Sequence, residues 1–212
     1  ADVSAGAAGA RAAEAPGGAG LLTEAEKKLL LALARAVVEA TAAGRAAPAP
    51  VQLAAELRLP LTPALQRKRG AFVTLTSGGR LRGCIGYIEG IQPLAAAVAD
   101  NAAAAASRDP RFHPVAVEEL PRLRIEISAL TPLRPVADAA AIEIGRHGIV
   151  LAKGRARAVF LPQVAPEQGW DLETTLDQLA MKAGLPPDAW RVGARFQVFE
   201  AEVFAEAGGH GH

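Results

Sequence analysis

The chain has 212 residues, a formal net charge of +1 and one cysteine, and half of its residues are hydrophobic. This length accommodates one large domain, or one domain with a small lobe. The near-zero charge speaks against a nucleic-acid-binding surface. A single cysteine excludes an intrachain disulfide framework and suits the reducing cytoplasm. No apolar run approaches the roughly 20 residues that span a bilayer, so we expect no membrane partner.

The two ends of the chain differ in composition from the rest. Residues 1–20 are rich in alanine and glycine and contain almost nothing large to bury, which predicts a disordered tail. Residues 207–212 are rich in glycine and histidine, and we expect a flexible tail there too. The preference for alanine, arginine, glycine and proline over lysine and asparagine is typical of a GC-rich genome, and we take it to indicate a bacterial source.

Local patterns predict a mixture of helices and hairpins in the first half of the chain. Thr23 and Glu26 form a capping box that opens a helix ending near residue 43, and a short helix follows over residues 51–58. Strands over 70–76 and 80–88 are joined by a turn at 77–79. A further helix is predicted over 93–106.

The second half of the chain continues in the same mixed order. A strand over 122–130 alternates apolar and polar residues, and 142–144 is a short strand or a turn entry. A hairpin pairs 148–152 with 157–161, and a helix capped by Asp171 ends at Lys182. A last strand covers 196–204 with a bulge near Phe199. This order predicts an α+β fold with a mainly antiparallel sheet flanked by helices.

The segment 81–87, with the sequence Leu-Arg-Gly-Cys-Ile-Gly-Tyr, contains the only cysteine of the chain. A strand projects alternate side chains to opposite faces. One face should therefore carry Arg82, Cys84 and Gly86. The other should face the core and carry Leu81, Ile85 and Tyr87. The first face would place a thiol beside a guanidinium.

Cys84 has two interpretations. In the first interpretation, Cys84 is a small buried hydrophobic residue, as free cysteines often are. Alternatively it is a catalytic nucleophile, a redox thiol or a metal ligand, and the cation of Arg82 would favour the thiolate form that each of these needs. In the second case Gly83 and Gly86 would let a substrate approach the backbone closely.

His113 and His147 are the internal histidines of the chain. His113 lies in a loop restricted by two prolines, and His147 lies in a glycine-rich turn. Either ring could act as a general base toward Cys84, and either could instead bond only to nearby backbone.

Four further residues are candidates for substrate binding. Asp109 and Arg111 flank Pro110, and such an arginine can bind a carboxylate or phosphate through two parallel bonds; the alternative is a turn-capping aspartate beside a surface arginine. Glu126 lies on the polar face of a predicted strand, where it is an ion-paired or solvated carboxylate or a substrate contact. Gln163 follows a proline at a strand end, where its amide could bond a ligand or the loop itself.

The sequence contains no strong signature of a metal or nucleotide site. Cys-x-x-Cys, His-Glu-x-x-His and a His-x-His inside the fold are absent, so we assign no metal ligand. The glycine-rich dinucleotide motif and the P-loop are also absent. The sequence therefore leaves the cofactor unknown.

Several motifs in order resemble one known family. They are the Leu-Arg-Gly-Cys-Ile-Gly run at 81–86, Asp-Pro-Arg-Phe at 109–112, Ile-Glu-Ile-Ser at 125–128, Gly-Arg-His-Gly-Ile at 145–149 and Lys-Ala-Gly-Leu at 182–185. The chain resembles the AMME chromosomal region family, whose bacterial and archaeal members are called AmmeMemoRadiSam system protein A. The resemblance covers roughly residues 21–206, which is nearly a whole domain.

The resemblance implies one α+β domain over 21–206, with a larger antiparallel-sheet lobe, a smaller lobe and a cleft between them. It also implies two partners, a Memo-like protein and a radical-SAM protein. Two functions stay open. In the first, the protein is a Cys84-dependent enzyme, or a redox or modification component of that system. In the second, it is a non-catalytic adaptor or small-molecule-binding protein of the same system.

Overall fold

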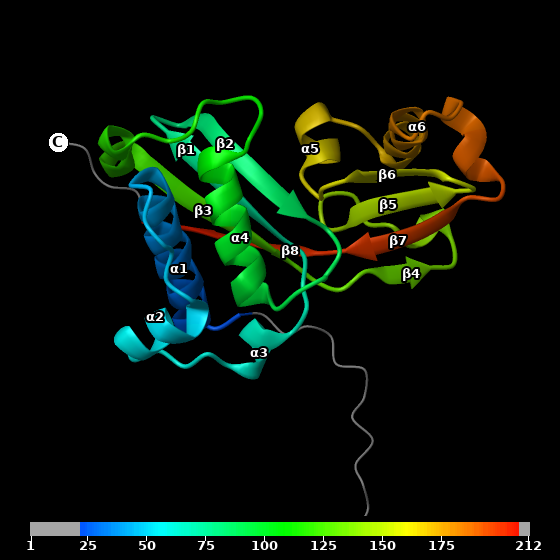
Figure 1. The fold of residues 1–212 in the computed structure, drawn as a ribbon. Helices are drawn as coiled ribbons and strands as arrows, with labels where there is room; N and C mark the ends of the chain where they lie inside the picture. Colours follow the sequence, from blue (N-terminus) through cyan, green and yellow to red (C-terminus); the bar gives the residue numbers. More distant parts are fainter. Residues whose placement is uncertain (1–21, 208–212) are drawn as a thin grey trace, which may run out of the picture.

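The computed structural model describes residues 22–207, which form two four-stranded antiparallel sheets. The first sheet has the order β2-β1-β3-β8, with strands Arg80–Tyr87, Ala71–Ser77, Leu123–Leu130 and Ala201–Ala205. The second has the order β4-β7-β5-β6, with strands Arg134–Val136, Arg195–Phe199, Gly148–Lys153 and Ala156–Phe160. Figure 1 shows the two sheets as two lobes, each with its own helices. The predicted α+β class, with a larger and a smaller lobe, is confirmed.

The larger lobe carries the two longest helices on one face of its sheet. These are α1 at Glu24–Ala42 and α4 at Leu94–Ser107, with the short helices α2 at Pro50–Glu56 and α3 at Pro63–Gln66 at one end (Figure 1). The predicted capping box is confirmed, because Thr23 Oγ1 accepts from the amide of Glu26, whose carboxylate accepts from the amide of Thr23. This exchange satisfies amides that the first helical turn would otherwise leave unbonded.

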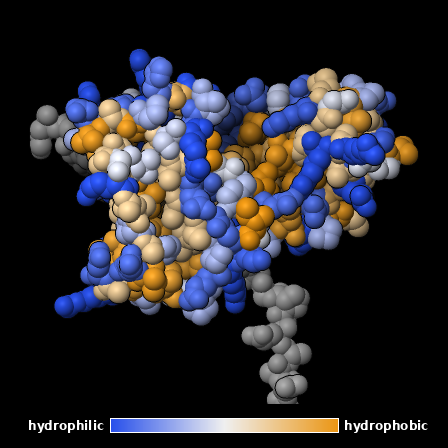
Figure 2. Space-filling model, in the orientation of Figure 1, coloured by the Kyte–Doolittle hydropathy of each residue, from blue (hydrophilic) through white to orange (hydrophobic). Residues whose placement is uncertain are grey.

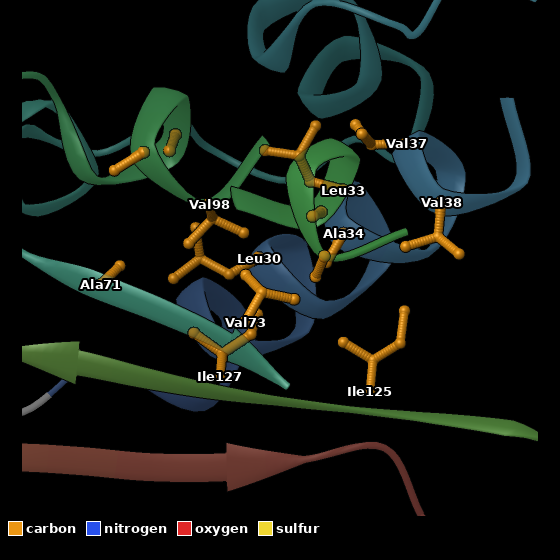
Figure 3. Packing of buried hydrophobic residues seen from close by; sticks show 14 of the residues in the cluster. Leu30, Leu33, Ala34, Val37, Val38, Ala71, Val73, Val98, Ile125 and Ile127 are labelled. Atoms are coloured by element: carbon orange, nitrogen blue, oxygen red, sulfur yellow. The ribbon is translucent and has the colours of Figure 1, made fainter. Parts of the chain in front are cut away.

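The core of the larger lobe lies between these helices and the sheet. Figure 3 shows Leu30 of α1 and Val98 of α4 close to Val73 of β1, with Ile127 of β3 beside it. Leu33 of α1 belongs to the same cluster. The helical side chains recur at intervals of three and four residues, and the strand side chains at intervals of two. The two local periods therefore bring one apolar face of each element into the same layer.

The smaller lobe is built in the same way around α6 at Leu172–Lys182. Leu176 and Leu179 of this helix pack against Leu151 and Val198 on one face of the second sheet. Asp171 caps α6 by accepting from the amide of Thr174, as the sequence predicts. Short elements complete the chain: α5 at Val164–Gln168 and three 3-10 turns at Val117–Arg122, Ala139–Ala141 and Pro187–Arg191.

The predicted single strand over 196–204 is wrong. The chain instead forms β7, which ends at Phe199, and β8, which begins at Ala201 in the other sheet. Val198 is buried in the smaller lobe, whereas Phe204 packs against the core of the larger one. The slip in alternation near Phe199 marks the passage between lobes rather than a bulge. A local pattern shows that a strand is interrupted, and only the partner strands show that it has changed sheet.

Other differences concern short elements. Of the two alternatives for residues 142–144, the short strand is wrong and the turn entry is confirmed, because a turn begins at Ile144. Ile142 ends the 3-10 turn at Ala139–Ala141 with its side chain buried. The elements β4, α3 and α5, which span three to five residues, are not predicted from the sequence. Elements of this length contain too few residues to show a period.

The lobes share a small apolar core at their boundary. Leu130, Val150 and Phe199 are buried there, and Phe72 and Ile88 pack against them. Beside this core lies a cleft of about 500 Å³ between the lobes. The cleft that the resemblance implies is thus present.

The predicted tail over 1–20 lies outside the described residues, as does 208–212 of the predicted C-terminal tail. Among residues 22–207, every helix is too short or too polar to cross a membrane.

Candidate functional site

A β-bulge interrupts the pairing of β2 at Arg82. Leu81 lies opposite Thr76 and Gly83 lies opposite Leu75, so Arg82 has no partner on β1. The predicted faces are therefore wrong for two residues. Leu81 is exposed instead of core-facing, and Arg82 does not share a face with Cys84. An extra residue in one strand reverses the alternation beyond it, which no local pattern reports.

The bulge directs Arg82 toward the loop and 3-10 turn that follow α4. Its Nε and one terminal nitrogen donate to the two carboxylate oxygens of Glu119 at 2.7 and 2.9 Å. Its other terminal nitrogen donates to the carbonyl of His113 at 3.0 Å. This bonding raises the pKa of Arg82 and lowers that of Glu119 to about 2. The guanidinium is thus occupied by Glu119 rather than by the thiol.

Replacing Glu119 with glutamine is expected to lower the free energy of unfolding by about 2 kcal/mol at neutral pH, because it removes a charge-assisted pair. A carboxylate whose pKa is lowered by folding stabilises the protein above its unfolded pKa and loses that effect as pH falls. The difference between wild type and Glu119→Gln should therefore shrink between pH 4.5 and pH 2. Denaturant titrations across this range measure it.

The neighbouring Glu118→Gln is the matched control, since Glu118 is exposed. It should leave stability nearly unchanged at every pH. A Glu119→Gln deficit that is the same at pH 7 and at pH 2.5 would contradict the prediction.

Both glycines of the motif are explained by packing. A Cβ atom at Gly83 would lie 2.3 Å from the carbonyl oxygen of Ala105, so the glycine lets α4 lie directly on β2. A Cβ atom at Gly86 would lie 2.4 Å from the ring of Phe72, so that glycine makes room for the aromatic side chain. The close approach that the sequence predicts is therefore made by the protein's own groups.

Asp109 and Arg111 bond the outer edge of β2 at Cys84. The carboxylate of Asp109 accepts from the amide of Cys84 at 2.8 Å, and a terminal nitrogen of Arg111 donates to the Cys84 carbonyl at 3.2 Å. These two groups occupy the positions that a neighbouring strand would otherwise take. The loop therefore protects an edge strand from pairing with another chain.

The same two residues also bind each other. Arg111 donates to Asp109 from its backbone amide, its Nε and a terminal nitrogen, at 3.1, 2.9 and 2.7 Å. These bonds hold the pKa of Asp109 far below its usual range and raise that of Arg111. The Asp109 side chain is 1 % exposed, whereas that of Arg111 is 54 % exposed. Of this pair, only the arginine offers surface to a ligand.

The thiol of Cys84 lies on the sheet face opposite the helices. It accepts a hydrogen bond from Thr74 Oγ1 at 3.3 Å, and Cys84 is half-buried. Glu126 of β3 lies opposite Thr74 on the same face, which puts it two strand spacings, or about 10 Å, from Cys84. A thiol, a hydroxyl and a carboxylate therefore form one row across three strands.

A surface hollow of about 450 Å³ lies in the loop that bonds the outer edge of β2. Arg82, Arg111, Phe112 and His113 line it together with Pro110. Both guanidinium groups lie near the Phe112 ring, that of Arg82 at 5.9 Å and that of Arg111 at 5.5 Å from its centroid. Cation–π contacts of this kind fix the orientation of both arginines.

The remaining predicted residues lie apart from the thiol. His113 is exposed, and its backbone carbonyl rather than its ring bonds to Arg82. His147 is buried in the smaller lobe, where its Nδ1 accepts from the amide of Glu143 and burial lowers its pKa. Gln163 is exposed at the start of α5. The structure gives neither histidine ring a bond to Cys84.

Two residues of the site were missed as functional candidates. Thr74 bonds the thiol, and the alternation of β1 places it on the open face, but only the register brings it opposite Cys84. Phe112 contacts both arginines through its ring, whereas in the sequence it is noticeable only as part of a motif. Within residues 22–207, no group of three or more His, Cys, Asp or Glu side chains is placed to hold a metal ion.

Together these features describe an α+β protein of two antiparallel sheets, with a cysteine on an edge strand that a charged loop covers. The AMMECR1 family model matches residues 31–204. The chain belongs to the AMMECR1 family.

Proteins of similar sequence include two from archaea. A protein of Methanosarcina acetivorans is 41% identical over 193 residues, covering 88% of this chain and 94% of its own length. A protein of Methanothermobacter thermautotrophicus is 46% identical over 161 residues, covering 72% of this chain and 84% of its own length. These relatives do not support the bacterial source that the composition suggested.

A solved structure has the same fold. The crystal structure of the uncharacterized protein PH0010 from Pyrococcus horikoshii superimposes with a TM-score of 0.69 at 37% sequence identity. The match covers 86% of this chain and 92% of the other.

Proposed function

We propose that Cys84 supplies a reactive thiol and that the protein transfers or modifies a group through it. The observation that carries the proposal is the division of roles within the motif. Arg82, Gly83 and Gly86 are each engaged in holding β2, through Glu119, through α4 and through Phe72. The thiol alone is presented on the open sheet face with a hydroxyl donor at 3.3 Å.

The chemical step would be a nucleophilic substitution. The thiol loses its proton to solvent, and the sulfur forms a bond to an electrophilic carbon of the substrate. The bond from that carbon to its leaving group breaks, and the leaving group departs with the electron pair. Thr74 would stabilise the sulfur anion by hydrogen bonding, and the exposed guanidinium of Arg111 would attract an anionic substrate. Glu126 would contact the substrate from the same face.

The proposal predicts that Cys84 reacts with iodoacetamide in the native protein. Because Cys84 is half-buried rather than enclosed, one alkyl group per chain should be added without denaturant. Thr74→Val should slow this reaction about fivefold, since one hydrogen bond to the anion is worth about 1 kcal/mol. Intact-mass spectrometry over time gives both rates.

Thr76→Val is the matched control, because Thr76 lies on the same strand face but opposite Leu81. It should leave the rate unchanged. Modification that occurs only after denaturation, or equal rates for the two threonine variants, would overturn the proposal.

A second candidate is a non-catalytic adaptor or binding protein. The observation that favours it is the saturation of the charged groups, because Glu119 occupies Arg82, and Asp109 is buried under Arg111. Such a site is rigid and has no group poised for proton transfer. The proposed partners are a Memo-like protein and a radical-SAM protein, and the proposed compartment is the cytoplasm. A Cys84→Ser variant that keeps both its partners and its function would favour this candidate; loss of function with partners retained would favour the thiol.

A further inference from the structure

The cleft between the lobes has the size and lining of a small-molecule site. One wall is the end of β2 and the loop after it, with Tyr87, Ile88 and Ile91. The other wall comes from β5 and β6. The volume of about 500 Å³ lies within the range of ligand pockets in proteins. Figure 2 shows apolar surface gathered where the lobes meet.

The apolar character of the cleft comes from both lobes. In the second wall the open apolar side chain is the partly buried Val159, whereas Val150 and Ala158 are already buried in the cores beside it. Ile91 is 61 % exposed, so it supplies open apolar surface on the first wall. An apolar body placed in the cleft would remove this surface from water.

One ion pair crosses the cleft. A terminal nitrogen of Arg157 on β6 lies 2.5 Å from Oε1 of Glu89 on the loop after β2. Both side chains are about half exposed, at 48% and 54%, so their pairing is weak and exchangeable. The contact uses one of the five donor hydrogens of the guanidinium, whose fork geometry fits a second anionic group.

The loop that carries Glu89 is fixed by its backbone. A Cβ atom at the adjacent Gly90 would lie 2.7 Å from the backbone carbonyl of Lys68, so the loop is packed tightly against the segment before β1. The wall of the cleft therefore keeps its position when the Glu89 side chain turns away. A ligand anion can then take its place on Arg157.

We propose that this cleft binds an amphipathic organic acid. Its flat apolar body lies between the Tyr87–Ile91 wall and the β5–β6 wall, and its single anionic group pairs with Arg157 in place of Glu89. The inference is independent of a catalytic role for Cys84, because Cys84 is not among the residues that line the cleft.

Two dyes with the same ring system test the proposal on the full chain. Anilinonaphthalene sulfonate carries one negative charge, and phenylnaphthylamine is the same body without it. We expect one molecule of the sulfonate to bind per chain, about tenfold more tightly than the neutral dye, because only it pairs with Arg157. Fluorescence titration and calorimetry give the affinities and the stoichiometry.

Charge variants separate the two parts of the site. Arg157→Gln should abolish the preference for the sulfonate and retain the neutral dye, which also shows that the variant is folded. Glu89→Gln should bind the sulfonate up to about fivefold more tightly, since the competing carboxylate is gone. Ile91→Asp should weaken both dyes. Val51→Asp, at a valine of matched exposure on α2, should change neither.

Several results would overturn the inference. They are the absence of binding for both dyes, equal affinity of the wild type for both, an unchanged preference in Arg157→Gln, and equal effects of the Ile91 and Val51 variants. Thermal melting of each variant excludes dye binding to unfolded protein.

Discussion

Gly83→Ala is expected to lower the free energy of unfolding by about 3 kcal/mol, because the added methyl group overpacks a closed interface. Its Cβ would lie 2.3 Å from the Ala105 carbonyl oxygen, which belongs to the backbone of α4 and cannot rotate aside. Either β2 or the helix must shift by about an ångström. For a chain of this size, the melting temperature should fall by about 6–12 °C.

The shift should also reach the thiol. Asp109 and Arg111 bond the backbone of the adjacent Cys84, so a displaced β2 loosens these bonds. Hydrogen exchange at the Cys84 amide should accelerate in Gly83→Ala by more than the global loss of stability explains.

Gly78→Asn, in the turn that joins β1 to β2, is the control. Gly78 has φ +56°, and a Cβ atom added there would meet nothing within 4 Å. Asparagine accepts this conformation well at the first place of a two-residue turn. The variant should keep the melting temperature within about 2 °C of wild type. A Gly83→Ala protein as stable as this control would show that α4 does not lie on β2 as described.

Asp109→Asn is expected to lower the free energy of unfolding by about 3 kcal/mol, although the side chain keeps its size and shape. Every group that contacts this carboxylate is a donor: the amides of Cys84 and Arg111, and two nitrogens of the Arg111 guanidinium. An asparagine must turn its amino group toward one of these donors. One buried bond is then lost and two donors face each other.

The loss of unfolding free energy caused by Asp109→Asn should become smaller as the pH falls. The pKa of Asp109 is held well below its ordinary value, so its contribution is present above about pH 4 and is lost as pH falls below it. The difference between wild type and Asp109→Asn should therefore be constant from pH 8 to pH 5 and should narrow in stronger acid. Urea titrations across this range measure it.

Asp138→Asn is the matched control, because Asp138 caps an exposed 3-10 turn, where asparagine caps equally well. Its effect should stay within about 0.5 kcal/mol. If the two asparagine variants were equally stable, the proposed bonding of the β2 edge by Asp109 would be wrong.

The fold class and most of the longer elements follow from the amino-acid sequence without any tertiary information. The capping box at Thr23 and Glu26, the helical spacing of Leu30 and Leu33, and the alternation of 122–130 are properties of neighbouring residues. Their physical basis is the helical period of 3.6 residues and the strand period of two, which act within one turn or one pair of residues. Such signals need no knowledge of the partner element. The same local signals located the cysteine motif on a strand.

How the motif is used depends on the tertiary structure. The bulge that turns Arg82 from the thiol toward Glu119 depends on the register between β1 and β2, and Asp109 reaches the Cys84 amide across 25 residues. The change from one sheet to the other at Glu200 likewise depends on which strands pair with β7 and β8. Hydrogen-bond partners far apart in the chain are selected by packing of whole elements, and that selection leaves no period in the local sequence.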